Sequence, residues 1–236
     1  MDGHGWQPTK YVERRGTLRA GAVSPASRLM ADLVAEFYAT SLPENAHGDL
    51  LDLGCGQAPL YGTYRSRVSS VTTGDWKAGP HVDHVTDLTA PLSFDDAAFD
   101  TVILSDVLEH LPNPALVLSE AHRLLRPGGT LLVNVPFLYG IHEAPYDFHR
   151  YTEFALRKMI DDAGLTLVEI EPLGGLLEVL SDLVGKGMTV VPGLGSLMAA
   201  LVHRLTWMVH SSPVGAALRS RTAAFTPSGY ALVARR

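Results

Sequence analysis

The chain alternates short apolar runs with segments in which apolar residues recur every three or four positions. Short apolar runs are typical of buried strands, whereas the longer spacing is typical of helices that bury one face. The predicted strands are 49–53, 70–75, 81–88, 99–105, 130–136, 165–171 and 230–234. Helices are expected to begin at Ser24-Pro25, Asn113-Pro114 and Thr152, and the second should continue to Arg126. The alternation predicts an α/β fold with a mostly parallel seven-stranded sheet and helices on both faces.

The length of 236 residues suits one α/β domain. We expect an N-terminal arm at 1–23 and a helical insertion at 173–225, before the last strand. Tyr11, Arg14 and Arg15 of the arm are candidates to cover a bound ligand, and a disordered arm is the alternative.

Two apolar stripes at helical spacing mark the insertion. The first comprises Leu176, Leu180, Leu183 and Val184, and the second comprises Leu194, Leu197, Met198, Leu201, Val202, Leu205 and Val209. Such stripes are usually core, so we expect both to pack onto the domain. A lid, a dimer face and a surface for a lipid-linked substrate are the alternatives.

Composition narrows the class of protein. A net charge of −6 without a basic stripe argues against a nucleic-acid partner. The single Cys55 allows no intramolecular disulfide and fits a reducing compartment. No signal-peptide pattern begins the chain, and charged residues interrupt 173–209 before it could span a membrane. We therefore expect a cytoplasmic protein with at most peripheral membrane contact, and a homodimer remains open.

The segment 50–59, LLDLGCGQAP, leads from a predicted strand into a glycine turn. Gly54 and Gly56 allow a ligand to approach the backbone closely. The dinucleotide pattern G-x-G-x-x-G is absent, because Pro59 takes the place of its third glycine. Asp52 at the strand end would repel a phosphate and attract an ammonium group. These features disfavour an oxidoreductase that uses a dinucleotide.

Further carboxylates follow the next two predicted strands. Asp75 comes 19 positions after Gly56, where dinucleotide folds place an acceptor for a ribose diol. Asp87 ends the third strand and could accept from an adenine amino group. With Asp52, these positions describe a site for a nucleoside that carries a cationic tail.

The set resembles class I S-adenosylmethionine-dependent methyltransferases, in particular small-molecule enzymes of the methyltransferase type 11 group. The matching pieces are 51–56, 74–75, 87–88, 99–102, 107–111 and 124–129. The resemblance implies a Rossmann-like fold and S-adenosylmethionine as the cofactor. It assigns cofactor binding to Asp52, Gly54, Cys55, Gly56, Asp75, Trp76, Asp87, Leu88, Ser105, Asp106, Val107 and His110. Ala58 departs from the family pattern, which commonly has a third glycine there.

The loop after the fifth strand is where an acceptor should bind, because ligands of open α/β sheets lie beyond the carboxyl ends of the strands. His142 and His149 are candidate general bases, and Asp147 is placed to orient an imidazole. The residues expected to line a substrate pocket are Tyr139, Glu143, Tyr146, Arg150 and Tyr151. No metal is expected, because the ligand spacing is loose.

The leading hypothesis is methyl transfer to a small molecule, with the hydroxyl of a sugar or natural-product intermediate as acceptor. The alternative is a non-catalytic protein that binds the cofactor or a partner on the same fold. A purely structural interpretation of Asp147, Arg150 and Thr152 is that they only stabilise the loop and cap the next helix.

Overall fold

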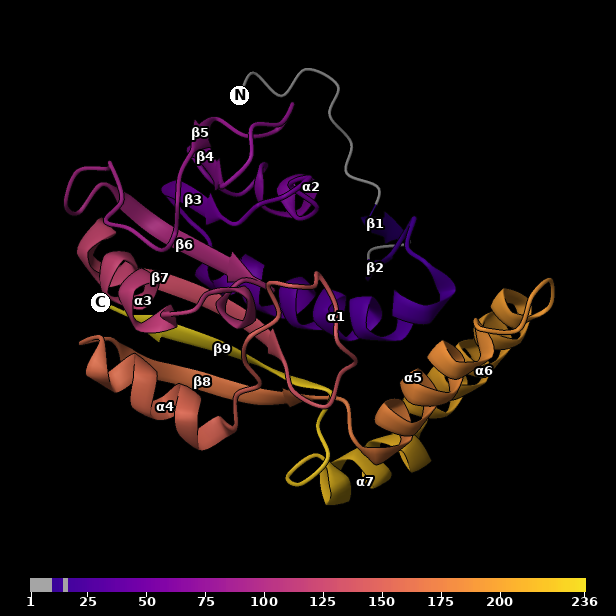
Figure 1. Cartoon of the computed structure of the whole chain (residues 1–236). Coiled ribbons are helices and arrows are strands. Elements are labelled where there is room, and N and C mark those ends of the chain that lie inside the picture. The colour runs from indigo at the N-terminus through magenta and orange to yellow at the C-terminus, as the bar shows by residue number, and fades with distance from the viewer. Residues whose placement is uncertain (1–9, 15–16) are drawn as a thin grey trace.

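The computed structural model describes residues 10–14 and 17–236, and a seven-stranded sheet forms its centre (Figure 1). The strands are β3 (Asp49–Leu53), β4 (Ser70–Asp75), β5 (His84–Val85), β6 (Phe99–Ser105), β7 (Leu125–Pro136), β8 (Thr166–Leu173) and β9 (Gly229–Arg235). Their order in the sheet is β5-β4-β3-β6-β7-β9-β8. Strand β9 is antiparallel to both neighbours and the other neighbouring pairs are parallel. The predicted Rossmann-like α/β fold is confirmed.

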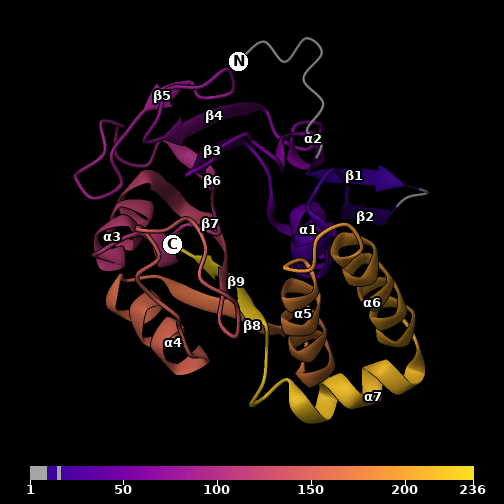
Figure 2. The same ribbon diagram turned by 45° about the vertical axis from the view of Figure 1, so that its right-hand side comes forward.

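Helices cover both faces of the sheet, and each face has its own hydrophobic core. The helices are η1 (Pro25–Ser27), α1 (Arg28–Asn45), α2 (Tyr61–Tyr64), η2 (Leu108–His110), α3 (Pro114–Leu124), α4 (Glu153–Asp162), α5 (Leu176–Met188), α6 (Gly195–His210) and α7 (Pro213–Thr222). Successive strand residues point to opposite faces. Leu51 and Leu53 therefore pack with α3 and α4, whereas Leu50 packs with α1 (Figures 1 and 2).

The third strand is shorter than predicted. It comprises His84–Val85 alone rather than 81–88, and it lies at the edge of the sheet. Next to it, Asp83 is held to Thr73 of β4 by backbone and side-chain hydrogen bonds: its backbone N donates to the Thr73 carbonyl at 3.1 Å, and its carboxylate accepts from the backbone N and the hydroxyl of Thr73 at 3.0 and 2.9 Å.

Helix α3 ends at Leu124, two residues before the predicted end at Arg126. Pro127 disfavours helical backbone in the residue that precedes it, so Arg126 joins strand β7. Its guanidinium then pairs with Asp49 at 3.0 Å and with Asp100.

The N-terminal arm forms a hairpin of β1 (Tyr11–Arg14) and β2 (Thr17–Ala20), which the hydrophobic pattern did not indicate. Asp32 of α1 accepts a hydrogen bond from the backbone N of Ala20 at 2.8 Å, and Arg28 donates to the carbonyl of Ala20 at 3.0 Å. Tyr11 is buried, and the hairpin therefore packs against α1. Arg15, a candidate cover residue, lies outside the described residues.

The expectation that both stripes of the insertion pack onto the core is wrong. Helices α5 and α6 form an antiparallel hairpin that projects from the domain (Figure 1), and their large apolar side chains face outward. Exposed members of the two stripes are Leu180, Leu183, Val184, Leu194, Leu197, Met198, Leu201, Leu205 and Val209. The buried faces are instead polar or small, which hydrophobic periodicity alone could not indicate.

A buried ion pair joins the base of this hairpin to the domain. His210 at the end of α6 is within 2.8 Å of Glu178 on α5 through Nδ1, and within 3.0 Å of Glu36 on α1 through Nε2. Burial opposes the charged imidazole, but the contacts with Glu178 and Glu36 prevail and raise the pKa of His210. Burial likewise opposes ionisation of Glu178, and the His210 contact prevails in lowering its pKa.

Replacing His210 by Gln should destabilise the protein by about 3 kcal/mol, because it leaves the buried Glu178 carboxylate with only the more distant Arg219 guanidinium, 3.9 Å away, among the described residues. A raised histidine pKa gives stabilisation that is complete below its unfolded value near 6.5 and lost as pH rises through the folded value. The lowered Glu178 pKa gives stabilisation above about 4.5 that is lost as pH falls through the folded value. Urea unfolding of both proteins across this range should therefore show the largest difference in mildly acidic solution. A difference independent of pH would contradict the pairing, and His47→Gln, at an exposed position, is the matched control.

Candidate functional site

A cavity of about 900 Å³ lies beyond the carboxyl ends of β3, β4, β6 and β7. The strand order reverses between β3 and β6, and such a reversal is where open α/β sheets bind ligands. The arm, η1 and α1 close the other side, with Lys10, Tyr11, Ser27 and Met30 in the lining. Tyr11 thus belongs to a cover over the cavity.

The glycine turn after β3 forms one wall. Gly54 and Gly56 have φ angles of 70° and 54°, in the left-handed region that favours glycine. The backbone N of Gly56 donates to Asp75 Oδ2 at 2.8 Å, which fixes the turn against the end of β4. A Cβ on Gly54 would lie 2.5 Å from Val107 Cγ2, whereas a Cβ on Gly56 would meet no atom within 4 Å. Bare backbone at Gly56 therefore faces open space in the cavity.

Asp52 contributes a buried negative group to the same wall. It is 2% exposed, and its Oδ2 accepts a hydrogen bond from the Tyr64 hydroxyl at 2.7 Å. Burial raises the pKa of Asp52 to about 7. A cation bound beside it would favour the ionised form, because an opposite charge offsets the loss of hydration. The wall thus fits the ammonium end of S-adenosylmethionine.

Most of the residues assigned to the cofactor line this cavity. They are Asp52, Gly54, Cys55, Gly56, Asp75, Trp76, Ser105, Asp106 and His110. Three assigned residues lie outside the lining. Asp87 is exposed and accepts from the backbone N and hydroxyl of Thr89, Leu88 is buried in the core, and Val107 packs beneath Gly54. Their cofactor contacts stay predictions.

Asp106 is held in the cavity floor by a chain of hydrogen bonds. The Tyr38 hydroxyl donates to Asn134 Oδ1 at 2.9 Å, and Asn134 Nδ2 donates to Asp106 Oδ1 at 2.6 Å. Lys10 of the arm lies 3.6 Å from Asp106 Oδ2 and connects the cover to the floor. Neither Tyr38 nor Asn134 could be assigned to the cavity floor from the sequence, because both belong to apolar segments whose pattern predicts core.

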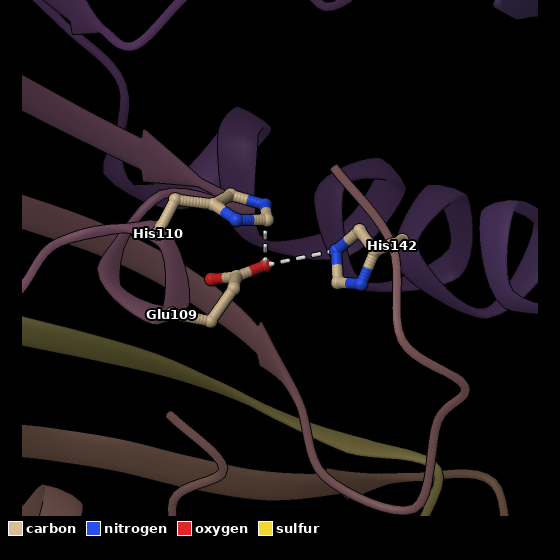
Figure 3. Close-up of side chains that lie close together, drawn as sticks. All are labelled: Glu109, His110 and His142. Carbon is tan, nitrogen blue, oxygen red and sulfur yellow. Dashed lines mark ion pairs between the residues drawn. The ribbon is translucent and has the colours of Figure 1, made fainter. Parts of the chain in front are cut away.

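Glu109, His110 and His142 form a cluster at the acceptor side of the cavity (Figure 3). Glu109 is fully buried, and its Oε1 lies 3.6 Å from Nε2 of His110 and 3.6 Å from Nε2 of His142. His110 and His142 line the cavity while Glu109 lies behind them. The sequence placed Glu109 beside His110 but carried no sign that its carboxylate would be buried.

Burial and proximity shift the protonation of this cluster. Burial raises the pKa of Glu109. Burial acts against the charged form of His142, but the adjacent Glu109 outweighs it and the pKa of His142 is raised. The pair therefore favours an imidazole that takes up a proton readily.

The same cluster has the donor atoms of a metal site. One potential ligand atom from each of the three residues lies within 4.8 Å of the others. Within 10–14 and 17–236, it is the one such group compact enough to hold a metal ion. Its two imidazoles and one carboxylate suit a divalent cation as well as a proton relay. The expectation of no metal stays a prediction.

Asp147 and Arg150 hold the loop that carries His142. Arg150 donates two hydrogen bonds to the Asp147 carboxylate at 2.5 and 2.7 Å, and it holds the pKa of Asp147 well below its usual range. Asp147 Oδ2 accepts from the backbone N of His142 at 3.0 Å and lies 3.4 Å from its Nδ1. Asp147 thus contacts the histidine that it was expected to orient, and Arg150 stabilises the loop.

The remaining acceptor-side residues divide between the cavity and its surroundings. Tyr139 and Glu143 line the cavity. His149 lies outside the lining, with its ring 5.5 Å from that of Tyr151, whose hydroxyl donates to the carbonyl of Leu108 at 2.7 Å. Tyr146 is outside the lining too, and its ring contacts that of Trp76 at 5.4 Å. Of the two candidate bases, His142 alone is placed at the cavity.

Known proteins resemble the chain in sequence and in fold. A family model described as a methyltransferase domain matches residues 23–170. A probable S-adenosylmethionine-dependent methyltransferase of Mycolicibacterium smegmatis is 37% identical over 97 residues, which cover 37% of this chain and 38% of that protein. A ubiquinone biosynthesis O-methyltransferase of Xanthomonas euvesicatoria is 27% identical over 173 residues, or 60% of this chain and 71% of that protein. The match to the first spans well under half of that relative's length.

The solved structure of the [4+2]-cyclase SpnF covers 97% of this chain and 86% of its own, with a TM-score of 0.58 at 17% identity. At that identity the likeness concerns the fold alone. The family model, by contrast, covers more than half of the sequence and includes the glycine turn, the strand-end carboxylates and the Glu109–His110 pair. The chain therefore belongs to the class I methyltransferases, whose methyl donor is S-adenosylmethionine.

Proposed function

We propose that the protein transfers a methyl group from S-adenosylmethionine to a hydroxyl of a small molecule, with His142 as the general base. The observation that carries the proposal is the position of His142 on the cavity wall, with Glu109 3.6 Å from its Nε2 and Asp147 3.4 Å from its Nδ1. A base between two carboxylates is both oriented and stabilised in its charged form.

The glycine side of the cavity would hold the cofactor. Asp75 offers acceptors to the ribose hydroxyls, Asp52 faces the amino end, and the Gly56 backbone allows close approach. When bound, S-adenosylmethionine would supply a methyl group on a sulfonium sulfur. Breaking the bond between this sulfur and the methyl carbon releases S-adenosylhomocysteine, a neutral thioether and a good leaving group. The protein then has to align the acceptor oxygen and remove its proton.

His142 would take the acceptor proton on Nε2, because its Nδ1 is buried and lies 3.4 Å from Asp147 Oδ2. Asp147 stabilises the resulting imidazolium while Arg150 keeps Asp147 ionised. Glu109 adds a second negative group beside Nε2. The proton thus passes from the acceptor oxygen to the imidazole as the oxygen–methyl bond forms.

Two observations bear on the class of acceptor. The ubiquinone biosynthesis O-methyltransferase among the relatives favours oxygen as the methylated atom. We propose a hydroxyl of a sugar or natural-product intermediate, for which Tyr139 offers an aromatic wall and Glu143 an acceptor for hydrogen bonds. SpnF is a cyclase on the same fold, so the fold by itself does not assign the reaction.

Replacing His142 by Ala should lower kcat by about 10²- to 10⁴-fold, the usual contribution of a positioned base, while S-adenosylhomocysteine affinity stays within about threefold. His149→Ala is the matched control, because its side chain lies outside the cavity lining. The measurement is formation of S-adenosylhomocysteine by mass spectrometry against a panel of hydroxyl acceptors, with calorimetry for cofactor binding. Unchanged turnover in His142→Ala would contradict the assignment, as would an equal loss in His149→Ala.

The pH profile tests the role of Glu109 separately. Since His142 must be neutral to accept a proton, kcat/KM should rise with pH through a pKa above about 6.5. Glu109→Gln removes the charge that raises this pKa, so the rising limb should move to lower pH. An unmoved limb would leave Glu109 a purely structural residue. Loss of turnover with a chelator, reversed by a divalent cation, would transfer the function of the cluster to a metal ion.

Two glycine variants test where the cofactor binds. Gly54→Ala combines a left-handed φ with a 2.5 Å contact to Val107, and we expect a loss of about 2–4 kcal/mol of stability. Gly56→Ala meets no protein atom and should cost about 1–2 kcal/mol, yet weaken S-adenosylhomocysteine binding by about tenfold or more because its methyl group projects into the cavity. Urea unfolding measures the stability of each variant. Calorimetric titration, with NADH as the control ligand, measures its affinity for S-adenosylhomocysteine. Full affinity in Gly56→Ala would place the ligand away from this loop.

A further inference from the structure

The hairpin of α5 and α6 has its polar groups inside and its apolar groups outside. Leu180, Leu197 and Leu201 are 51%, 69% and 56% exposed. Between the helices, Thr206 donates to Ser181 Oγ at 2.7 Å. Water-soluble helices normally bury the apolar face, so this arrangement indicates that the outer face meets an apolar environment.

The polar interior of the hairpin is closely packed. Asp182 pairs with Lys186 on the same helix, and Gly185 leaves room for the buried ring of His203, whose Nε2 would lie 2.4 Å from a Cβ at that glycine. Small residues at a helix contact are typical of helices that pack closely in a hydrocarbon environment. The hairpin has such a contact at Gly185, and the buried polar atoms His203 Nδ1, His203 Nε2 and Asp182 Oδ1 have no hydrogen-bond partner within the described part of the chain.

The far end of the hairpin is free of formal charge. No Asp, Glu, Lys or Arg occurs from 187 to 203, and the turn between the helices exposes Val190, Val191 and Leu194. The nine residue-to-residue steps from Gly195 to Arg204 rise about 14 Å along α6, close to half of the roughly 30 Å hydrocarbon core of a bilayer. The uncharged end therefore matches the depth of one leaflet.

The distribution of charge on the insertion also favours contact with lipid. Its two acidic residues, Glu178 and Asp182, are buried, whereas Arg204 and Arg221 are exposed. The exposed formal charges from 176 to 222 are thus basic, in a chain whose net charge is −6. Arginine beside an apolar segment suits lipid headgroups, which are anionic or zwitterionic.

We propose that the end of the α5–α6 hairpin inserts into one leaflet of a lipid bilayer, with Arg204 at the level of the headgroups. A second copy of the chain fits the surface less well. Over 187–203 the exposed side chains that offer hydrogen bonds are Thr189 and Ser196, and Thr189 Oγ1 already donates to the carbonyl of Lys186 at 2.7 Å. Specific protein interfaces carry about one hydrogen bond per 100–200 Å².

Insertion at this depth does not require a membrane span. None of the helices in the described part of the chain has the length and apolar character needed to cross a bilayer. A hairpin that enters one leaflet and returns does not need helices long and apolar enough to cross the bilayer. It can still bury its apolar face in lipid.

The hairpin also contacts residues that line the cavity. Lys186 Nζ lies 3.3 Å from the centre of the Tyr139 ring, and both helices contact η1, whose Ser27 lines the cavity. Figure 2 shows the hairpin beside α1 and strands β1 and β2. Docking would therefore bring the cavity close to the membrane surface.

Flotation of the full chain with vesicles tests the proposal. Wild-type protein should float with vesicles of phosphatidylcholine and more strongly when phosphatidylglycerol is included. The double variant Leu197→Glu/Leu201→Glu should bind both kinds of vesicle about tenfold or more weakly, since charge at these positions opposes entry into hydrocarbon. Phe154→Glu, on α4 and 80% exposed, is the matched control and should float like wild type. Arg204→Glu should remove the enhancement by phosphatidylglycerol.

A second measurement does not depend on a charge substitution. Leu194→Cys, labelled with an environment-sensitive fluorophore, should show a blue shift with vesicles, because Cys55 is buried and leaves the new thiol as the reactive one. Absence of flotation together with absence of a shift overturns the proposal. A second outcome also overturns it: the wild-type protein is a dimer in lipid-free buffer, Leu197→Glu/Leu201→Glu is a monomer, and neither protein binds vesicles. That result would assign the apolar face to a second copy of the chain.

Discussion

Buried negative charge is the constraint on which the site depends. Asp52, Asp75 and Glu109 come from the ends of three different strands or the turns after them, and all three are buried around one cavity. A carboxylate removed from water must be neutralised, hydrogen-bonded or paired with a cation. Each of the three meets that requirement differently, and the differences define the two ends of the cavity.

Asp75 is satisfied by the protein itself, because the backbone N of Gly56 donates to it and thereby shapes the glycine turn. Within the described part of the chain, Asp52 receives a side-chain hydrogen bond from the Tyr64 hydroxyl alone, and its raised pKa marks a place where a bound cation would be stabilised. Glu109 faces two imidazoles, which makes it a partner for a proton. The parallel sheet brings these groups together, since the carboxyl ends of its strands meet at one edge.

Much of this arrangement could be predicted from sequence because it depends on local patterns. The strand ending in Asp52, the turn at Gly54 and Gly56, and the acid at Asp75 occur at a spacing that a βαβ unit fixes. The loop with His142 could be located because it follows the fifth strand, at the edge where open α/β sheets bind ligands. What could not be predicted depends on tertiary contacts. His142 and His149 have the same chemistry, and only the path of the loop directs one toward the cavity and the other toward Tyr151.

The insertion shows a different limit of hydrophobic periodicity. The spacing of Leu194, Leu197 and Leu201 correctly predicts a helix, but it does not reveal which environment the apolar face contacts. The polar residues decide that question, because His203 and Thr206 recur on the opposite face of α6 and are buried against α5. A helix whose polar face is regularly spaced and contacts polar groups of a neighbouring helix can pack that face inward. The apolar face is then left exposed, which is the basis of the proposed contact with lipid.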